Sequence, residues 1–224
     1  METKSIVTRL FIVSEWITRI AFLNLIWLLF NLPIFYLSFH LFVSTLPQQL
    51  LAIVSLIAVL SPLLLFPSTT ALFGVARKWV QGELGVKLLP SFWKFYKENY
   101  LRSLLGGIAF TIVWLFLILD FYYFSTIKSP IYYLFLVVAL FMVVITINFF
   151  SLSVHYEGTL FQTMKNAFLL TLGRPVHTLG IAFISIACFY ISFNLLPFLL
   201  FLGLGSLCAY GSFFIFHRGV TPAA

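Results

Sequence analysis

Three polar residues in the first apolar segment have the spacing that brings side chains onto one side of a helix. Asn24, Trp27 and Asn31 stand at positions i, i+3 and i+7, and residues at these intervals share a helical face. An asparagine in hydrocarbon usually forms a hydrogen bond with a neighbouring helix. The alternative is a path for a neutral polar solute such as a sugar, and the residues leave both interpretations open.

A proline in the second apolar segment is followed by three hydroxyl-bearing residues. Pro67 removes one backbone donor and frees a helical carbonyl, and Ser68, Thr69 and Thr70 can satisfy the freed backbone groups. We expect a kink here, with a discontinuous ligand-binding helix as the alternative. The possible intramembrane polar face comprises Asn24, Trp27, Asn31, Pro67, Thr70 and Asn148.

The stretch SFWKFYKENY, residues 91–100, combines aromatic rings with lysines. Trp93, Tyr96 and Tyr100 recur at i, i+3 and i+7, which predicts a helix lying on the membrane surface with its rings at the headgroup boundary. Docking of a cytosolic partner is the alternative, and nucleic-acid binding is not expected. The candidate residues for lipid or partner contact are Trp93, Lys94, Tyr96, Lys97, Tyr100 and Lys165.

The sequence lacks the usual signatures of catalysis, nucleotide binding and metal binding. It has no GxxxxGK[ST], GxGxxG or HExxH motif, and its six acidic residues are scattered. His155, His177 and His217 fall near the predicted cytoplasmic face with Glu157; His155 and His177 are interpreted as interfacial residues at helix ends, and a metal or catalytic cluster is the alternative. Cys188 and Cys208 stand in apolar runs, where cysteine usually acts as a small hydrophobe. We therefore expect no enzyme activity, no cofactor, no metal site and no disulfide.

The composition indicates an integral membrane protein. Of the 224 residues, 62% are hydrophobic and 8% are charged, and the mean hydropathy is +1.10. Soluble domains carry about 25% charged residues, so a chain this apolar could not keep its surface in water.

Apolar segments of about 20 residues predict membrane-spanning helices. We expect an all-α polytopic protein with a single transmembrane domain, residues 1–224. The six predicted spans are 20–42, 50–77, 103–124, 131–154, 178–196 and 198–216, the last two separated at Pro197. The predicted cytoplasmic amphipathic segments are 3–18, 90–101 and 158–172.

The basic residues predict the orientation of the chain. With six spans and a cytoplasmic N-terminus, twelve of the thirteen lysines and arginines fall on the inner side, and only Lys128 falls outside. Cytoplasmic loops retain such an excess of positive charge. We expect a multi-pass protein of the bacterial plasma membrane with both termini in the cytoplasm.

Several longer motifs resemble the YesL-like family of bacterial membrane proteins. They are LFPSTTALFGVARKWVQGE, FWKFYKENYLRSLLGG and HYEGTLFQTMKNAFLLTLGRP, with WITR before the first span. Members of this family are often associated with carbohydrate-utilisation systems that include ABC-type sugar importers. The resemblance implies a non-enzymatic accessory or regulatory role in carbohydrate uptake, with importer subunits as partners; the alternative is a small transporter or channel for a neutral polar solute. It implies nothing about oligomeric state.

The predicted topology can be tested by cysteine labelling. A single cysteine at Lys87 is expected to react with a membrane-impermeant thiol reagent only from the inside, because its loop is rich in basic residues. A single cysteine at Ser125 is expected to react only from the outside. Labelling of both positions from the same side would contradict the topology.

Overall fold

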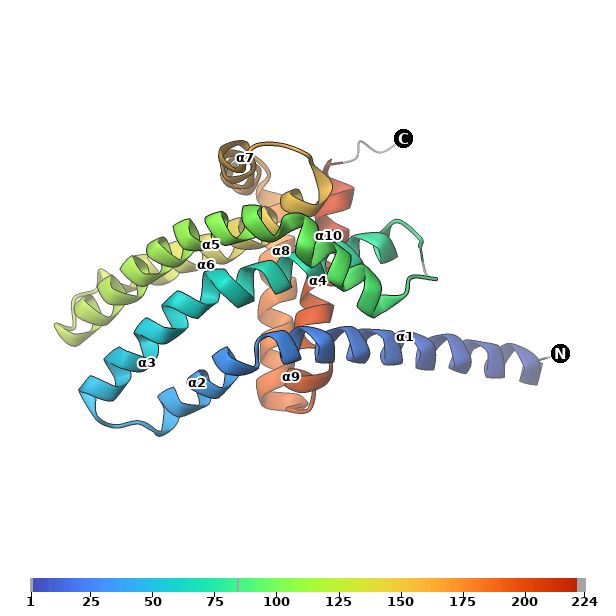
Figure 1. The fold of residues 1–224 in the computed structure, drawn as a ribbon, viewed down its shortest axis with the longest axis horizontal. Helices are drawn as coiled ribbons and strands as arrows, with labels where there is room; N and C mark the ends of the chain where they lie inside the picture. Colours follow the sequence, from blue (N-terminus) through green and yellow to red (C-terminus); the bar gives the residue numbers. More distant parts are fainter. Residues whose placement is uncertain (1, 84, 221–224) are drawn as a thin grey trace.

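The computed structural model describes residues 2–83 and 85–220, and its regular elements are all helices (Figure 1). In chain order they are α1 (Glu2–Phe30), α2 (Leu32–Val43), α3 (Pro47–Leu60), the π-helical turn η1 (Ser61–Leu65), α4 (Phe66–Val80), α5 (Leu88–Thr126), α6 (Tyr132–His155), α7 (Leu160–Gly173), α8 (Pro175–Tyr190), the π-helical turn η2 (Ile191–Leu195), α9 (Leu199–Leu202) and α10 (Leu204–Val220).

Five helical stretches are long and apolar enough to cross a membrane, which supports the predicted multi-pass architecture. The predicted sixth span, 198–216, is divided between the one-turn α9 and the 17-residue α10, so six full spans are not confirmed. The five stretches are Leu10–Phe30, Gln48–Val80, Leu88–Thr126, Tyr132–His155 and Pro175–Leu195.

The predicted first span, 20–42, is interrupted at Asn31, where α1 ends and α2 begins. Pro33 is in the first turn of α2, and a proline there has no N–H to continue the preceding helix. The predicted amphipathic segment 3–18 is not a separate helix, because α1 runs without a break from Glu2. The side chains of residues 1–9 lie outside the described part.

The stretch 90–101 and the predicted span 103–124 form one helix rather than two. α5 has 39 residues, which corresponds to a length of about 58 Å at 1.5 Å per residue. Between Ser91 and Ser103 no proline or glycine interrupts the helical hydrogen bonds. The first turns of α5 nevertheless run in a different direction from the rest of the helix (Figure 1).

The proline-containing segment departs from a regular α-helix just before Pro67, where a kink was predicted. Pro62 falls within η1 and Pro67 in the first turn of α4. The Ser61 hydroxyl donates to the Ile57 carbonyl at 2.7 Å, and the Ser68 hydroxyl donates to the Leu64 carbonyl at 2.6 Å. Such hydroxyl bonds help to satisfy backbone carbonyls where a transmembrane helix is irregular.

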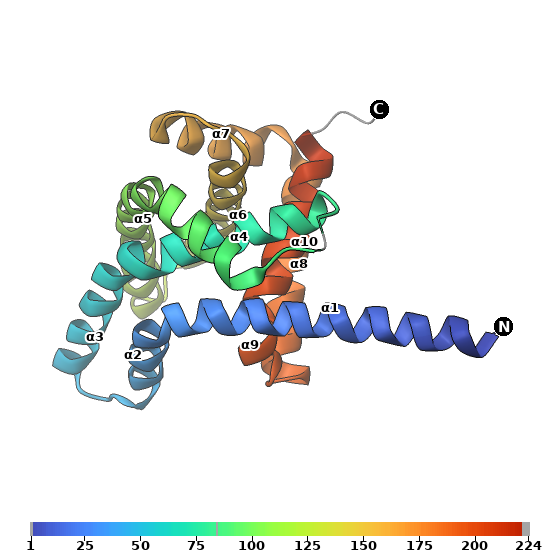
Figure 2. The same ribbon diagram turned by 45° about the vertical axis from the view of Figure 1, so that its right-hand side comes forward.

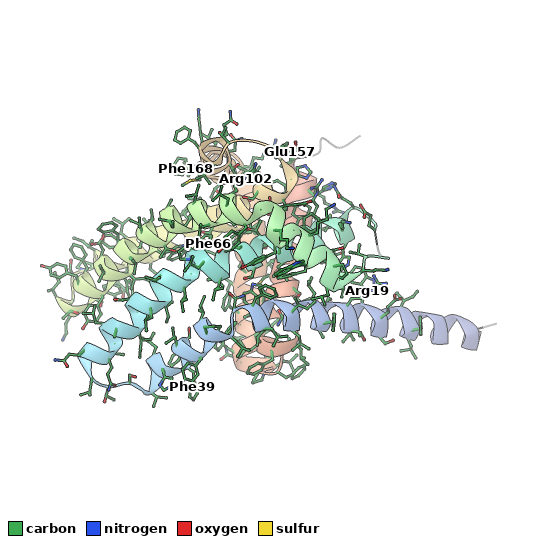
Figure 3. The ribbon with its side chains drawn as sticks, viewed as in Figure 1. Arg19, Phe39, Phe66, Arg102, Glu157 and Phe168 are labelled. Carbon is green, nitrogen blue, oxygen red and sulfur yellow. The ribbon has the colours of Figure 1, made fainter. Side chains whose placement is uncertain are left out.

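α4 forms the centre of the packing, since most of its residues from Phe66 to Ala76 are buried. The Phe66 ring packs against Phe110 of α5 and Phe150 of α6, with centroids 6.1 and 5.4 Å apart. Figure 3 shows Phe66 inside the bundle, whereas Phe39 and Phe168 point outward. The many exposed large apolar side chains suit a surface in contact with lipid.

Two antiparallel pairs and one crossing helix give the molecule its shape. α5 lies beside α6, and α8 lies beside α10, in both views (Figures 1 and 2). α1 crosses the α8–α10 pair, and its first half projects beyond the other helices. At the crossing, the Trp16 ring packs against Trp79 of α4 and Tyr210 of α10, with centroids 5.7 and 5.6 Å apart.

The close approach of α5 and α6 requires a glycine at position 106. A Cβ on Gly106 would overlap with the ring of Phe149, which is fully buried. We expect Gly106→Ala to lower the free energy of unfolding by about 1–3 kcal/mol, because overpacking forces neighbouring groups to shift. Thermal unfolding in detergent measures the effect. Gly173→Ala is the control, since a Cβ there meets no atom within 4 Å, and equal unfolding temperatures for both variants would contradict the prediction.

Candidate functional site

Asn24 connects α1 to the start of α10. Its Nδ2 donates to the Phe201 carbonyl at 2.7 Å, and its Oδ1 accepts from the Gly205 and Ser206 amides at 2.9 and 3.2 Å. The first amides of a helix have no partner within the helix. The fully buried Asn24 therefore caps α10 from another helix and also satisfies a carbonyl of α9.

Gly205 lets α1 approach α10 at this point. A Cβ there would lie 3.0 Å from Asn24 Oδ1 and 3.2 Å from the Trp27 ring, tighter than ordinary van der Waals contact. The absence of a side chain thus brings the backbone amide of Gly205 within reach of Asn24, as small residues do at helix interfaces in membranes.

Trp27 and Asn31 connect the same face of α1 to α4. The Trp27 indole N–H donates to Thr69 Oγ1 at 3.0 Å. Asn31 Nδ2 donates to Ser68 Oγ at 2.8 Å and to the Trp27 carbonyl at 2.7 Å. Each of the three polar residues predicted to share a face therefore has a hydrogen-bonding partner within the protein.

The other predicted members of the polar face lie elsewhere. Thr70 Oγ1 accepts from Ser103 Oγ at 2.7 Å and joins α4 to α5. Asn148 Nδ2 donates to Thr171 Oγ1 of α7 at 2.9 Å. Pro67 is buried in the first turn of α4. The six candidates thus form several separate helix contacts, and they do not line one continuous path.

Two adjoining cavities lie beside these contacts, with volumes of about 490 and 300 Å³. Both are bordered by Thr69, Trp114, Thr146 and Phe150. The Trp114 indole N–H is 3.4 Å from Thr146 Oγ1, and the remaining lining is mostly apolar. Their described linings contain no lysine, arginine, histidine or acidic residue, so the cavities suit a hydrocarbon group better than a sugar.

The aromatic stripe of SFWKFYKENY packs partly against α1. Phe30 at the end of α1 contacts Phe92, Trp93 and Tyr96, with centroids 5.2, 5.9 and 5.1 Å apart. Trp93 and Tyr96 stack with an interplanar angle of 2°, and Tyr100 follows Tyr96 along the helix. Trp93 is still 45% exposed, so one edge of the stripe remains available to lipid or protein.

The lysines predicted to act with this stripe remain on the surface. Lys97 Nζ lies 5.0 Å from the centroid of the Trp93 ring, and Lys94 Nζ lies 3.7 Å from Glu98 Oε1. Lys165 is exposed on α7, a separate helix in the predicted segment 158–172. Its N-terminus is closed by a capping box between Thr159 and Gln162.

Two arginines have a structural role that sequence reasoning missed. Arg102 donates to the carbonyls of Ser153, Tyr156 and Gly158 at 3.3, 3.0 and 2.7 Å. Arg77 donates from Nη1 to the Val154 carbonyl. The last carbonyls of a helix have no partner within it and carry partial negative charge, so α4 and α5 both cap the end of α6. From the sequence, Arg77 and Arg102 contribute only to the excess of basic residues that predicts the orientation of the chain.

The histidines and cysteines do not form a metal site in the part of the chain that the structure describes. No group of three or more His, Cys, Asp or Glu side chains is placed to hold an ion there. Cys188 and Cys208 are free thiols. His155 packs against His217, with ring centroids 6.1 Å apart.

Comparison with known proteins confirms the family resemblance. Residues 20–121 match the family described as "Protein of unknown function, DUF624". "Uncharacterized protein YteU" of Bacillus subtilis (strain 168) is 26% identical over 198 residues, which are 85% of this chain and 76% of that protein. "Uncharacterized protein YesL" of the same organism is 24% identical over 186 residues, covering 80% and 77%. No solved structure matches the chain significantly.

Replacement of Asn24 should destabilise the protein. Asn24→Ala leaves two amides of α10 and the Phe201 carbonyl without this partner, and we expect a loss of about 1–3 kcal/mol in the free energy of unfolding. Thermal unfolding in detergent provides the measurement. The control is Asn194→Ala, because the exposed Asn194 donates only to the nearby Tyr190 carbonyl. A loss no larger than that of the control would contradict the capping role.

Proposed function

We propose that this relative of the YesL-like (DUF624) proteins is a non-enzymatic membrane protein that assists carbohydrate uptake. It would act as an accessory or regulatory partner of an ABC-type sugar importer in the bacterial plasma membrane. The carbohydrate context comes from the family resemblance. The choice of an accessory role over a transport role comes from the way the polar side chains are used.

The observation that carries this choice is the bonding of Asn24, Trp27 and Asn31. A carrier for a neutral polar solute needs polar groups that can exchange their partners for the solute. Here Asn24 bonds to α9 and α10, while Trp27 and Asn31 bond to α4. The adjoining cavities are mainly apolar. These features support a scaffold held together by its polar groups.

Two helical segments offer exposed aromatic and basic side chains for docking. The first turns of α5 pack against the end of α1, and α7 is a separate helix that follows α6. They present the exposed residues Trp93, Lys94, Lys97 and Lys165. Aromatic and basic side chains of this kind can bind a partner protein through packing and charge.

Co-purification from mild detergent tests the proposal. The tagged chain is expected to retain importer permease or ATPase subunits, and Trp93→Ser with Lys97→Gln is expected to weaken retention about tenfold, because a contact aromatic and a charge are lost. Lys128→Gln, in the turn at the other end of α5, is the control. Absence of importer subunits, together with unchanged sugar uptake after deletion of the gene, would show that the proposal is wrong.

Reconstitution separates the accessory role from the transport alternative. Liposomes that contain only this protein are expected to show no sugar flux above empty liposomes. Flux that depends on the protein alone would favour a small transporter.

A further inference from the structure

A pocket lies between the N-terminal end of α8 and the C-terminal end of α10. Its volume is about 590 Å³, and the two helices that line it run side by side (Figures 1 and 2). α8 and α10 approach each other closely at Gly180. A Cβ on this residue would lie only 3.0 Å from Ile215 Cδ1. The pocket is lined by Arg174, Pro175, Val176, His177, Gly180, Ile215, Arg218 and Gly219.

His177 is a buried polar group without a partner in this pocket. Its side chain belongs to a residue that is only 7% exposed, and neither Nδ1 nor Nε2 has a hydrogen-bond partner in the described part of the chain. Most buried polar groups in proteins are hydrogen-bonded. An imidazole always carries at least one N–H donor, so His177 can donate to an acceptor that enters the pocket.

Two exposed arginines and a helix N-terminus add positive charge to the same place. Arg174 and Arg218 line the pocket, and neither takes part in the ion pairs formed among the described residues. α8 has 16 residues and begins here at Pro175, so its first amides carry partial positive charge. Arg218, in the last turn of α10, offsets the opposite charge at that helix end. None of the described lining residues is acidic.

The surroundings of the pocket indicate a ligand with an apolar part. Val176, Leu179 and Phe183 stand at i, i+3 and i+7 along α8 and are 84%, 70% and 73% exposed. They form an apolar stripe that leads from the pocket along the face of α8. A membrane lipid has the matching arrangement, with a charged headgroup above acyl chains, and basic pockets between membrane helices are suited to anionic headgroups.

We propose that this pocket binds the phosphate of one anionic phospholipid, with Arg174, Arg218 and His177 as its ligands and the α8 stripe against an acyl chain. The site is separate from the aromatic stripe at Trp93. It does not depend on a role in sugar uptake.

Lipid binding to the purified full chain in detergent, measured by native mass spectrometry, tests the site. We expect the first phosphatidylglycerol to bind about tenfold more tightly than phosphatidylcholine, and R174Q/R218Q to remove most of this preference, because each basic group near an anionic lipid contributes severalfold. K87Q/K128Q removes two exposed charges outside the pocket and should keep the preference. His177→Gln retains a donor and should bind better than His177→Leu.

Three results would overturn the proposal. Equal loss of the preference in R174Q/R218Q and K87Q/K128Q would indicate diffuse attraction to a basic protein. Equal binding of the two lipids by the wild-type chain would exclude an anionic headgroup site. Inorganic phosphate that binds the wild-type chain as tightly as phosphatidylglycerol, and fails to bind R174Q/R218Q, would identify a free phosphate as the ligand. Unchanged thermal unfolding of R174Q/R218Q ensures that these results report on binding.

Discussion

The structure depends on hydrogen bonds that buried polar side chains form between the helices of an apolar bundle. The clearest case is Asn24. Its side-chain amide bonds to a carbonyl of α9 and to two backbone amides at the start of α10, where the C-terminal helix is interrupted. In hydrocarbon no water would satisfy the free amides at the start of α10. A single side chain of α1 therefore makes the break in the C-terminal region possible, and Gly205 makes room for it.

Hydrogen bonds of the same kind explain why α4 occupies the centre. Ser68 and Thr69 bond to α1, Thr70 bonds to α5, and Arg77 bonds to the end of α6. Through these four residues α4 is bonded to three neighbouring helices, while its apolar residues fill the space between them. Because these polar groups are engaged in the architecture, they are less suited to the exchange of partners that transport of a polar solute requires. This is the physical link between the fold and the proposed accessory role.

Arginines near α7 have two different environments. Arg77 and Arg102 are engaged with the carbonyls of α6, whereas Arg174 and Arg218 line an open pocket with a buried histidine. The engaged arginines stabilise a helix terminus through its partial negative charge. Among the described residues Arg174 and Arg218 form no ion pair, although Arg218 lies over the Phe214 ring, so their charge is available to an anionic ligand.

Composition and spacing alone predicted the all-helical membrane architecture, the break near Pro197, a helix in 158–172 and the shared face of Asn24, Trp27 and Asn31. These features depend on local quantities, namely hydrophobicity, the 3.6-residue period and the missing donor of proline. The sequence does not predict the continuity of α5. The change from polar to apolar residues near Ser103 indicates a boundary between two helices, but no residue there breaks a helix. The partners of Asn24, Arg102 and Phe30 were decided only by the tertiary structure. These contacts join residues far apart in the chain, separated by 177 positions for Asn24 and Phe201, and a periodic pattern says which side of a helix is polar but not which helix will face it.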